Sequence, residues 1–154
     1  MACINVVDIS MYHSFFADNG SNAMPTLTQI TLYTDADGYA RFREDPLPFP
    51  EGTPAVRLSG RYPAKSVQFR HSPVGFASEF HCTAQPQWTF ILAGQMEIIL
   101  RDGSRRLFCA GEGFYSNDLL PENEAFHPQI HGHKSRQVGD AALVTLFISA
   151  RQKK

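Results

Sequence analysis

Short stretches that alternate apolar and polar residues recur along the chain, separated by glycine, proline, asparagine and aspartate. A period of two puts successive side chains on opposite faces of a strand. Turn residues at about every 8 to 12 positions are typical of β-sandwiches and barrels. The pattern predicts strands over residues 27–33, 39–43, 55–59, 66–70, 77–83, 88–92, 95–101, 105–109, 113–117, 130–137 and 143–150. No window keeps a helical period, so an all-β fold with little helix is expected.

One hairpin stands out in this pattern. The predicted strand 95–101 runs through Asp102-Gly103 into the strand that begins at Arg105. Asp-Gly tolerates positive φ angles, so a tight two-residue turn is expected there.

Composition narrows the class of protein. The chain has 154 residues, of which 43% are hydrophobic and 19% charged, with a formal net charge of −1. This indicates a globular domain, and the absence of a basic stripe argues against nucleic-acid binding. The apolar runs are too short to span a bilayer, so no membrane segment is expected. The first residues lack a basic flank, so no secretory signal and a cytoplasmic location are expected.

The domain is expected to occupy residues 24–154. The turn-rich run at residues 19–22 precedes a fresh apolar pattern after Met24. Residues 1–23 are therefore an N-terminal appendage, either an expression leader or a native arm that packs on the domain or a partner.

Residues 80–94 (FHCTAQPQWTFILAG) combine a polar strand, a break at Pro86, an aromatic strand and a closing glycine. This stretch resembles the first motif of the cupin superfamily, in which two histidines, a glutamate and a glycine follow in order. Aligned on Gly94, His81 takes the place of the first histidine, Thr83 that of the second and Gln87 that of the glutamate. The resemblance implies a cupin-type jelly-roll barrel, a double-stranded β-helix.

The second cupin motif carries one more histidine before a Gly-Asp turn. Gly139-Asp140 provides that turn, and the family spacing reaches back to His133. Residues 131–136 (HGHKSR) also resemble a run of an uncharacterised bacterial and fungal cupin subgroup, with Asp118 near that subgroup's acidic residue. The resemblance covers roughly residues 55–150, and it implies a homodimer of single-domain subunits.

In a barrel, the faces that carry these residues would all point inward. We therefore predict a small-molecule pocket with a possible divalent metal (Zn, Fe, Ni or Cu) held by His81, Gln87 and His133. The other residues predicted to line the pocket or bind substrate are Thr83, Gln85, Thr89, Asp118, His131, Ser135 and Arg136.

Each of these residues also has a plainer interpretation. The two histidines could be packing residues, and Gln87 could cap the strand break. His131 would face the interior, or solvent if Gly132 bends the strand. Asp118 and Arg136 could bind a substrate carboxylate or pair with each other, but surface salt bridges are the favoured interpretation of both.

Function stays open at this point between an enzyme and a binding protein. One hypothesis is a metal-assisted oxygenase or isomerase centred on His81, Gln87 and His133. The alternative is a non-catalytic module that binds or senses a small ligand without metal, which the threonine and glutamine replacements favour. A metal-free sugar-nucleotide isomerase with a histidine base is a third hypothesis.

Overall fold

The computed structural model describes residues 24–150, so the predicted appendage 1–23 lies outside the described residues. These residues form β-strands joined by turns and contain no helix. The strands are β1 (Thr26–Thr34), β2 (Ala40–Pro48), β3 (Glu51–Thr53), β4 (Val56–Leu58), β5 (Ala64–Ser72), β6 (Gln87–Ala93), β7 (Gln95–Ile99), β8 (Arg105–Cys109), β9 (Gly113–Asn117), β10 (Lys134–Val138) and β11 (Leu143–Ala150). The all-β prediction is confirmed.

The chain divides into two compact units. The described part of the first comprises residues 24–29 and 44–62, and it contains the β3–β4 hairpin, in which Gly52 lies opposite Arg57. The second comprises residues 30–43 and everything described from Pro63 onward. All residues of the predicted site belong to the second unit.

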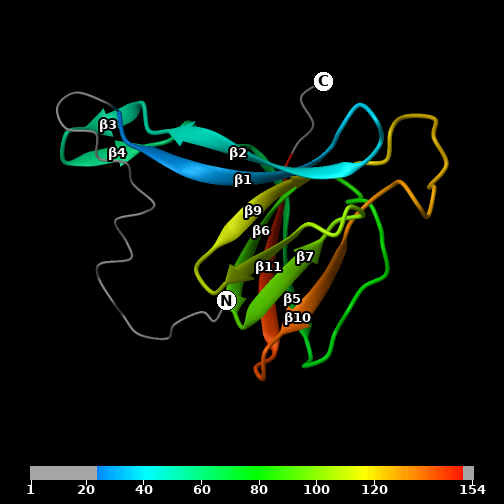
Figure 1. Ribbon diagram of the computed structural model, residues 1–154. Coiled ribbons are helices and arrows are strands. Elements are labelled where there is room, and N and C mark those ends of the chain that lie inside the picture. The colour runs from blue at the N-terminus through cyan, green and yellow to red at the C-terminus, as the bar shows by residue number, and fades with distance from the viewer. Residues whose placement is uncertain (1–23, 151–154) are drawn as a thin grey trace. The chain divides into compact units, whose positions relative to one another are not determined.

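Two sheets provide the framework of the second unit. One is six-stranded, in the order β2-β1-β9-β6-β11-β5, and the other is three-stranded, in the order β10-β7-β8 (Figure 1). β1 and β9 pair in parallel, whereas β10 with β7, β7 with β8, β11 with β5, β11 with β6 and β6 with β9 pair antiparallel. The hydrogen-bonded orders of the described strands do not join into one closed ring.

Residues 76–83 extend the smaller sheet without forming a regular strand. Only Ala77 opposite Arg136 and His81 opposite His133 form bridges to the β10 side. The predicted strand over 77–83 is therefore reduced to two isolated bridges. Ser78 N still donates to Ser135 O, but the Ser135 amide donates to the Ser78 side chain instead of to a backbone carbonyl.

The apolar core lies where β1, β7, β8 and β9 bring their inward faces together. Its largest buried members include Leu32, Met96, Ile98, Phe108 and Phe114. The rings of Phe108 and Phe114 are 4.6 Å apart, so strands of both sheets meet in this core. Burial of such side chains is the main stabilising contribution available to an all-β unit of this size.

The hairpin between β7 and β8 differs from the expected two-residue turn. Leu100 N donates to Ser104 O at 2.9 Å, and Gly103 N donates to Leu100 O at 3.1 Å. Gly103 has a φ of 83°, whereas Asp102 is not among the residues with positive φ. The loop therefore has three residues, with Gly103 alone in the left-handed region, a common arrangement for hairpins.

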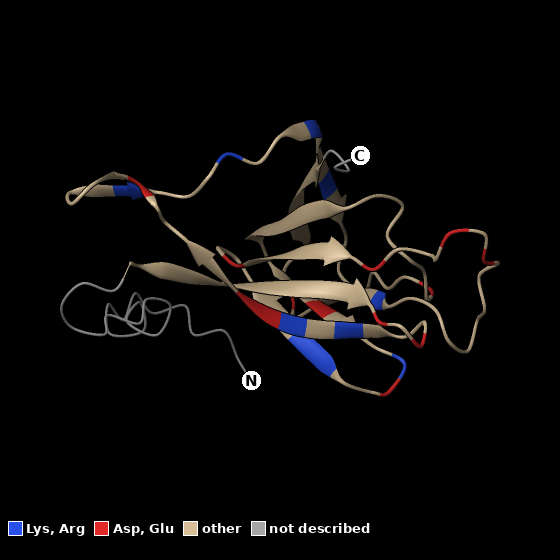
Figure 2. Ribbon diagram, turned by 90° about the horizontal axis from the view of Figure 1, so that it is seen from above, with Lys and Arg blue, Asp and Glu red and all other residues tan. Residues whose placement is uncertain are grey.

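Charges are mixed along the described strands. Figure 2 shows basic and acidic positions interspersed on β2 and on the loops, and sequence places Arg41, Arg43, Glu44 and Asp45 on that one strand. Between residues 24 and 150, no helix is present that could cross a membrane.

Candidate functional site

The interior between the two sheets is polar on the side of β10 and β11. β10 contributes Ser135 and Gln137, which lie opposite the core residues Ile98 and Met96 and therefore share their face. Buried hydroxyl and ionisable residues occupy this side of the interior: Thr83, Thr89, Ser116, Asp118, His133, Ser135, Thr145 and Ser149. Such a lining suits a hydrophilic ligand, because buried polar groups need hydrogen-bond partners.

The two predicted histidines meet in this polar interior. His81 and His133 form a reciprocal backbone bridge, with N···O distances of 2.9 and 3.0 Å. Their ring centroids are 4.8 Å apart and the rings are inclined by 48°. His133 is 5% exposed, whereas His81 is exposed to solvent. The pair thus extends from the surface into the interior.

Asp118 holds His133 in one orientation. The Asp118 side chain is fully buried, and its Oδ2 accepts a hydrogen bond from His133 Nδ1 at 2.7 Å. Its Oδ1 accepts one from Thr34 Oγ1 at 2.8 Å. With the proton on Nδ1, the lone pair of His133 lies on Nε2.

The surface salt bridge favoured for Asp118 is therefore wrong. The residue follows β9 directly, and the backbone of Thr83 donates to its carbonyl oxygen at 2.7 Å, which places it inside. A buried carboxylate without partners would be costly, and His133 and Thr34 provide these partners.

His81 is held in the same tautomer as His133. Its Nδ1 lies 2.9 Å from Glu79 O, a group that can only accept, so Nε2 carries the lone pair here as well. Partial desolvation lowers the pKa of His81, and the Glu79 carbonyl, which accepts from its ring, opposes this; the neighbouring His133 and Arg70 lower the pKa further, and Asp118 raises it. His81 is therefore neutral at neutral pH.

The remaining predicted residues on strands near the pair take different positions. Thr83 Oγ1 and Ser116 Oγ are 2.6 Å apart, and Ser116 lies on β9 shortly before Asp118. Gln87 lies opposite Ser116 in the β6–β9 register, but no hydrogen bond joins its side chain to either histidine among the described residues. Thr89 is buried one inward position further along β6.

Two more predicted residues border the segment that carries His81. Ser135 is buried on β10, and its amide N–H donates to Ser78 Oγ at 2.9 Å instead of to a carbonyl oxygen. Gln85 is half-buried in the turn before β6 and lies outside the strands.

Arg136 and His131 lie outside this cluster. Arg136 is on the outer face of β10, where its Nε donates to Glu97 Oε2 at 2.7 Å, so the surface salt bridge expected for it is confirmed, although not with Asp118. His131 is 4% exposed, so the expectation that it faces solvent is wrong. Gly132 does bend the chain, with a φ of 83°, but it turns His131 into the loop at residues 124–130, where His127 N donates to its Nδ1.

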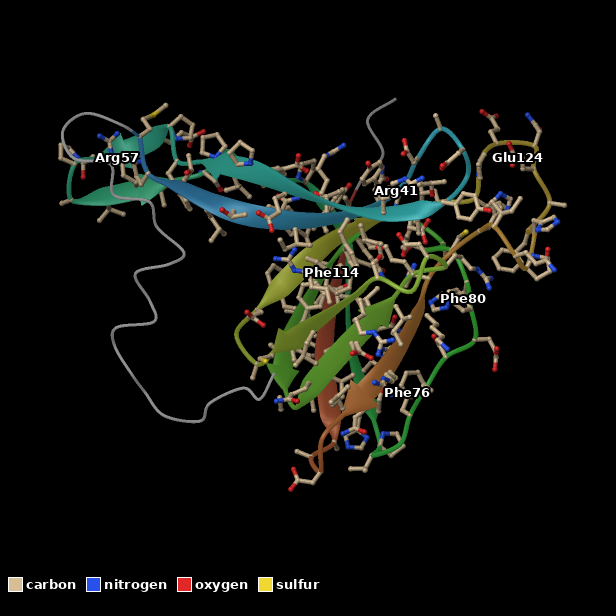
Figure 3. All side chains as sticks on the ribbon, viewed as in Figure 1. Arg41, Arg57, Phe76, Phe80, Phe114 and Glu124 are labelled. Carbon is tan, nitrogen blue, oxygen red and sulfur yellow. The ribbon has the colours of Figure 1, made fainter. Side chains whose placement is uncertain are left out.

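Cys82 is a free cysteine on the opposite side of the segment from His81. Desolvation and the nearby Asp118 charge raise the pKa of its thiol to about 11, although Arg101 opposes this shift. Arg101 also covers the ring of Phe80, with 3.5 Å between its guanidinium carbon and the ring centroid, and Figure 3 shows Phe80 on this same segment. Cys82 is thus a protonated thiol at neutral pH and a poor nucleophile.

The donor set fits a metal only in part. His81 and His133 both present unprotonated Nε2 atoms, which is the form that ligates divalent transition metals. In the described part of the chain, no three His, Cys, Asp or Glu side chains are grouped so as to hold an ion. Catalytic zinc sites use three protein ligands, so this pair alone is one ligand short.

Sequence reasoning missed Thr34 and Ser116. Thr34 ends β1 and its hydroxyl hydrogen is shared between Asp118 Oδ1 and Leu119 O, at 2.8 and 2.7 Å. A β-strand ending in threonine carries no local signal for such a role, because β1 and Asp118 are brought together only by the parallel pairing with β9.

A small open hollow of about 180 Å³ occurs elsewhere in the second unit, lined by Asp37, Tyr39, Ala40, Arg41 and Asp102. It shares no residue with the histidine cluster, and Arg41 within it is already paired with Asp35 and Asp37. Comparison with protein-family models and with curated proteins finds no match to this chain.

Proposed function

We propose that the protein is a small-molecule isomerase in which His133 acts as a general base and Asp118 orients it. The observation that carries this proposal is the buried 2.7 Å hydrogen bond between His133 Nδ1 and Asp118 Oδ2. A carboxylate at Nδ1 leaves Nε2 free to take a proton and stabilises the imidazolium that results. His81 provides a second neutral imidazole at the solvent side.

The chemistry is a proton transfer. His133 Nε2 removes a proton from a carbon next to a carbonyl group of the substrate, the electron pair moves to the carbonyl oxygen, and the imidazolium later returns the proton. The substrate enters beside His81, which is exposed and can accept a hydrogen bond through Nε2. The polar interior beyond the pair would bind the hydroxyl groups of such a molecule.

Solvent-deuterium incorporation tests this proposal. The protein is incubated in D₂O with a panel of sugar nucleotides, aldoses and 2-oxo acids, and carbon-bound deuterium is followed by NMR. We expect incorporation by the parent, and roughly 100-fold or greater loss in His133→Gln and Asp118→Asn. Arg105→Gln, at an exposed arginine on β8, serves as a control away from the site. Equal incorporation by parent and His133→Gln would contradict the proposal.

Two-bond proton–nitrogen NMR spectra test the carrying observation without a substrate. We expect His133 to show a protonated Nδ1 and an unprotonated Nε2 at neutral pH. A protonated Nε2 would remove the base from the proposed mechanism.

A divalent metal is a second candidate, favoured by the 4.8 Å separation of the two imidazole rings. His81 and His133 would hold the ion through Nε2, and when bound it would polarise a substrate oxygen. Elemental analysis of protein purified without a His tag tests this. Stoichiometric metal that is lost in both His81→Ala and His133→Ala would favour the metalloenzyme, and saturable ligand binding without turnover would favour the non-catalytic module.

We also propose cupin membership, a homodimer and a cytoplasmic location. The approach of His81 and His133, one from each of the two motif-like stretches, supports the first. The edge strand β5 supports the homodimer, because Val67 and Phe69 on this strand are 58% and 68% exposed. Light scattering of the parent and Phe69→Glu tests the dimer, which the substitution is expected to dissociate.

A further inference from the structure

Arg70 on β5 has an environment that its charge does not match. Its guanidinium carbon lies 4.9 Å from the ring centroid of Phe147 and 5.2 Å from that of Phe76, so the cation is placed between two aromatic rings. Phe76 begins the segment that carries His81 (Figure 3). The rings attract the cation through their faces, but they accept none of its in-plane hydrogen bonds.

The guanidinium lacks a partner. Arg70 Nε is buried and has no hydrogen-bond acceptor among residues 24–150. Burial lowers the pKa of Arg70, and no carboxylate of the described chain opposes that shift. An arginine in this position usually has a carboxylate beside it, because desolvating an uncompensated cation is costly.

A second orphaned polar group lies next to Arg70. Thr145 on β11 is its partner in the β5–β11 register and is fully buried, and Thr145 Oγ1 also has no hydrogen-bond partner in the described structure. Residues directly opposite in an antiparallel pair share one face of the sheet. Two unsatisfied groups that can donate, Nε–H and Oγ–H, therefore occupy neighbouring positions on the inward face.

This pair adjoins the histidine site. The charge of Arg70 also lowers the pKa of His81, as the smallest of the causes, after desolvation and the neighbouring His133. Both groups also contact the same segment, Arg70 at Phe76 and His133 at His81. Asp118, the buried carboxylate nearby, is already bonded to His133 and Thr34.

We infer that Arg70 and Thr145 form an oxyanion subsite that takes a carboxylate or phosphoryl group of the substrate. The guanidinium provides charge and a directed N–H donor, and the threonine hydroxyl provides a second donor, which is the recognition chemistry of both groups. The inference rests on the proposed function for the reacting end of the molecule: the anionic group is held at Arg70 while a carbon further along reaches His133.

Anion binding by the full chain tests the subsite directly. Thermal unfolding is followed against increasing inorganic phosphate in one series and acetate in another, each at constant ionic strength balanced with chloride. Ligand that binds the folded state raises the midpoint in proportion to its affinity. We expect at least one anion to raise it saturably, phosphate alone indicating a phosphoryl group, acetate alone a carboxylate, and both an unselective oxyanion site.

Variants locate the binding. We expect Arg70→Gln to weaken the apparent affinity about tenfold or more, and Thr145→Val about threefold, since the charged donor contributes more than the neutral one. Arg105→Gln, at an exposed arginine on β8, should bind as the parent does. Arg70→Lys keeps the charge but loses the Nε donor, and it carries the test if Arg70→Gln does not fold, with an expected loss of about threefold.

The outcomes separate this inference from the proposed base. No saturable rise with either anion, or equal affinities in Arg70→Gln and Arg105→Gln, would overturn the subsite. His133→Gln should retain anion binding to within about twofold, because its imidazole does not contact the subsite. Anion binding that survives in His133→Gln while deuterium incorporation is absent from the parent would uphold the subsite and reject the base.

Discussion

At the scale of single residues, two buried threonines differ only in whether their hydroxyls are bonded. Thr83 Oγ1 pairs with Ser116 Oγ at 2.6 Å, whereas Thr145 Oγ1 has no partner in the described chain. An unsatisfied buried hydroxyl costs about 1–3 kcal/mol, and a satisfied one contributes about 1 kcal/mol. Replacement by valine is therefore expected to stabilise the fold at Thr145 and to destabilise it at Thr83.

We predict that Thr145→Val raises the free energy of unfolding by about 1 kcal/mol in anion-free buffer, and that Thr83→Val lowers it by about 1–2 kcal/mol. Urea unfolding of both variants beside the parent measures the difference. A loss of stability in Thr145→Val would show that its hydroxyl is bonded in the folded protein.

Cys82 should react slowly with alkylating reagents. Its pKa of about 11, against an ordinary value of 9.0, reduces the thiolate fraction at neutral pH roughly 100-fold. Iodoacetamide labelling followed by peptide mass spectrometry should show that the alkylation rate of Cys82 rises with pH from about pH 7 to about pH 10. A plateau below about pH 9 would contradict the raised pKa.

At the scale of elements, β5 turns polar residues inward and apolar residues toward solvent. Val67 and Phe69 are exposed, whereas Arg70 is half-buried and Ser72 is buried. The pattern alone would place the apolar face inside. The structure reverses it because the interior opposite β5 is the polar side, formed by residues such as Thr145 and Ser149 of β11.

The close approach of His81 to β10 depends on Gly132. A Cβ at this position would lie 2.5 Å from His81 O, and the φ of 83° disfavours any side chain. We predict that Gly132→Ala lowers the free energy of unfolding by about 1–3 kcal/mol and separates the two imidazoles. Gly103→Ala is the control, since nothing lies near its Cβ although its φ is also 83°. Equal losses in the two variants would show that strain alone, and not the contact, matters.

Most strands follow from local pattern, and the site follows from it only in part. The bounds of β8, β9 and β11 agree with the expected ranges, because each is flanked by turn residues. The short β3 was missed, since three exposed residues have no periodicity to detect. The roles of Thr34 and Arg70 could not be predicted, because their contacts are made by residues distant in sequence.

At the scale of the whole molecule, the interior is divided between an apolar core and a polar site. The core cluster includes Leu32, Met96 and Phe108, and the polar side includes Asp118 and His133. The sequence indicated that His81 and His133 share one site, and it named Asp118 among the candidate pocket residues. A surface salt bridge was nevertheless the favoured interpretation of Asp118, because a carboxylate is usually solvated unless it has a partner. That partner becomes visible only when the sheets pack together.

Acid should destabilise the protein partly through His81. Its pKa is lower in the folded chain, mainly because of desolvation, so below about pH 6.5 the unfolded chain takes up a proton that the folded chain does not. The stability contributed by the neutral ring is complete above that pH and is lost as pH falls. We predict a shallower decline for His81→Gln between about pH 7.5 and 5, measured by urea unfolding.

The two segments that carry the histidine pair, β10 with the residues before it and the segment around His81, differ in how they are hydrogen-bonded to the sheet. β10 is hydrogen-bonded to β7 from Lys134 through Val138, while the neighbouring segment that carries His81 is joined to the β10 side by two isolated bridges, at Ala77 and His81, and by the backbone hydrogen bonds of Ser78 N and Gln137 N. The amides of Glu79 and Phe80 have no backbone acceptor in the described structure, so amide hydrogen exchange should be faster at these two residues than along β10, through local opening well below the cost of global unfolding. A molecule that binds at the histidine pair would enter when the segment that carries His81 separates transiently from β10. Its residence time would depend on how fast that segment closes again.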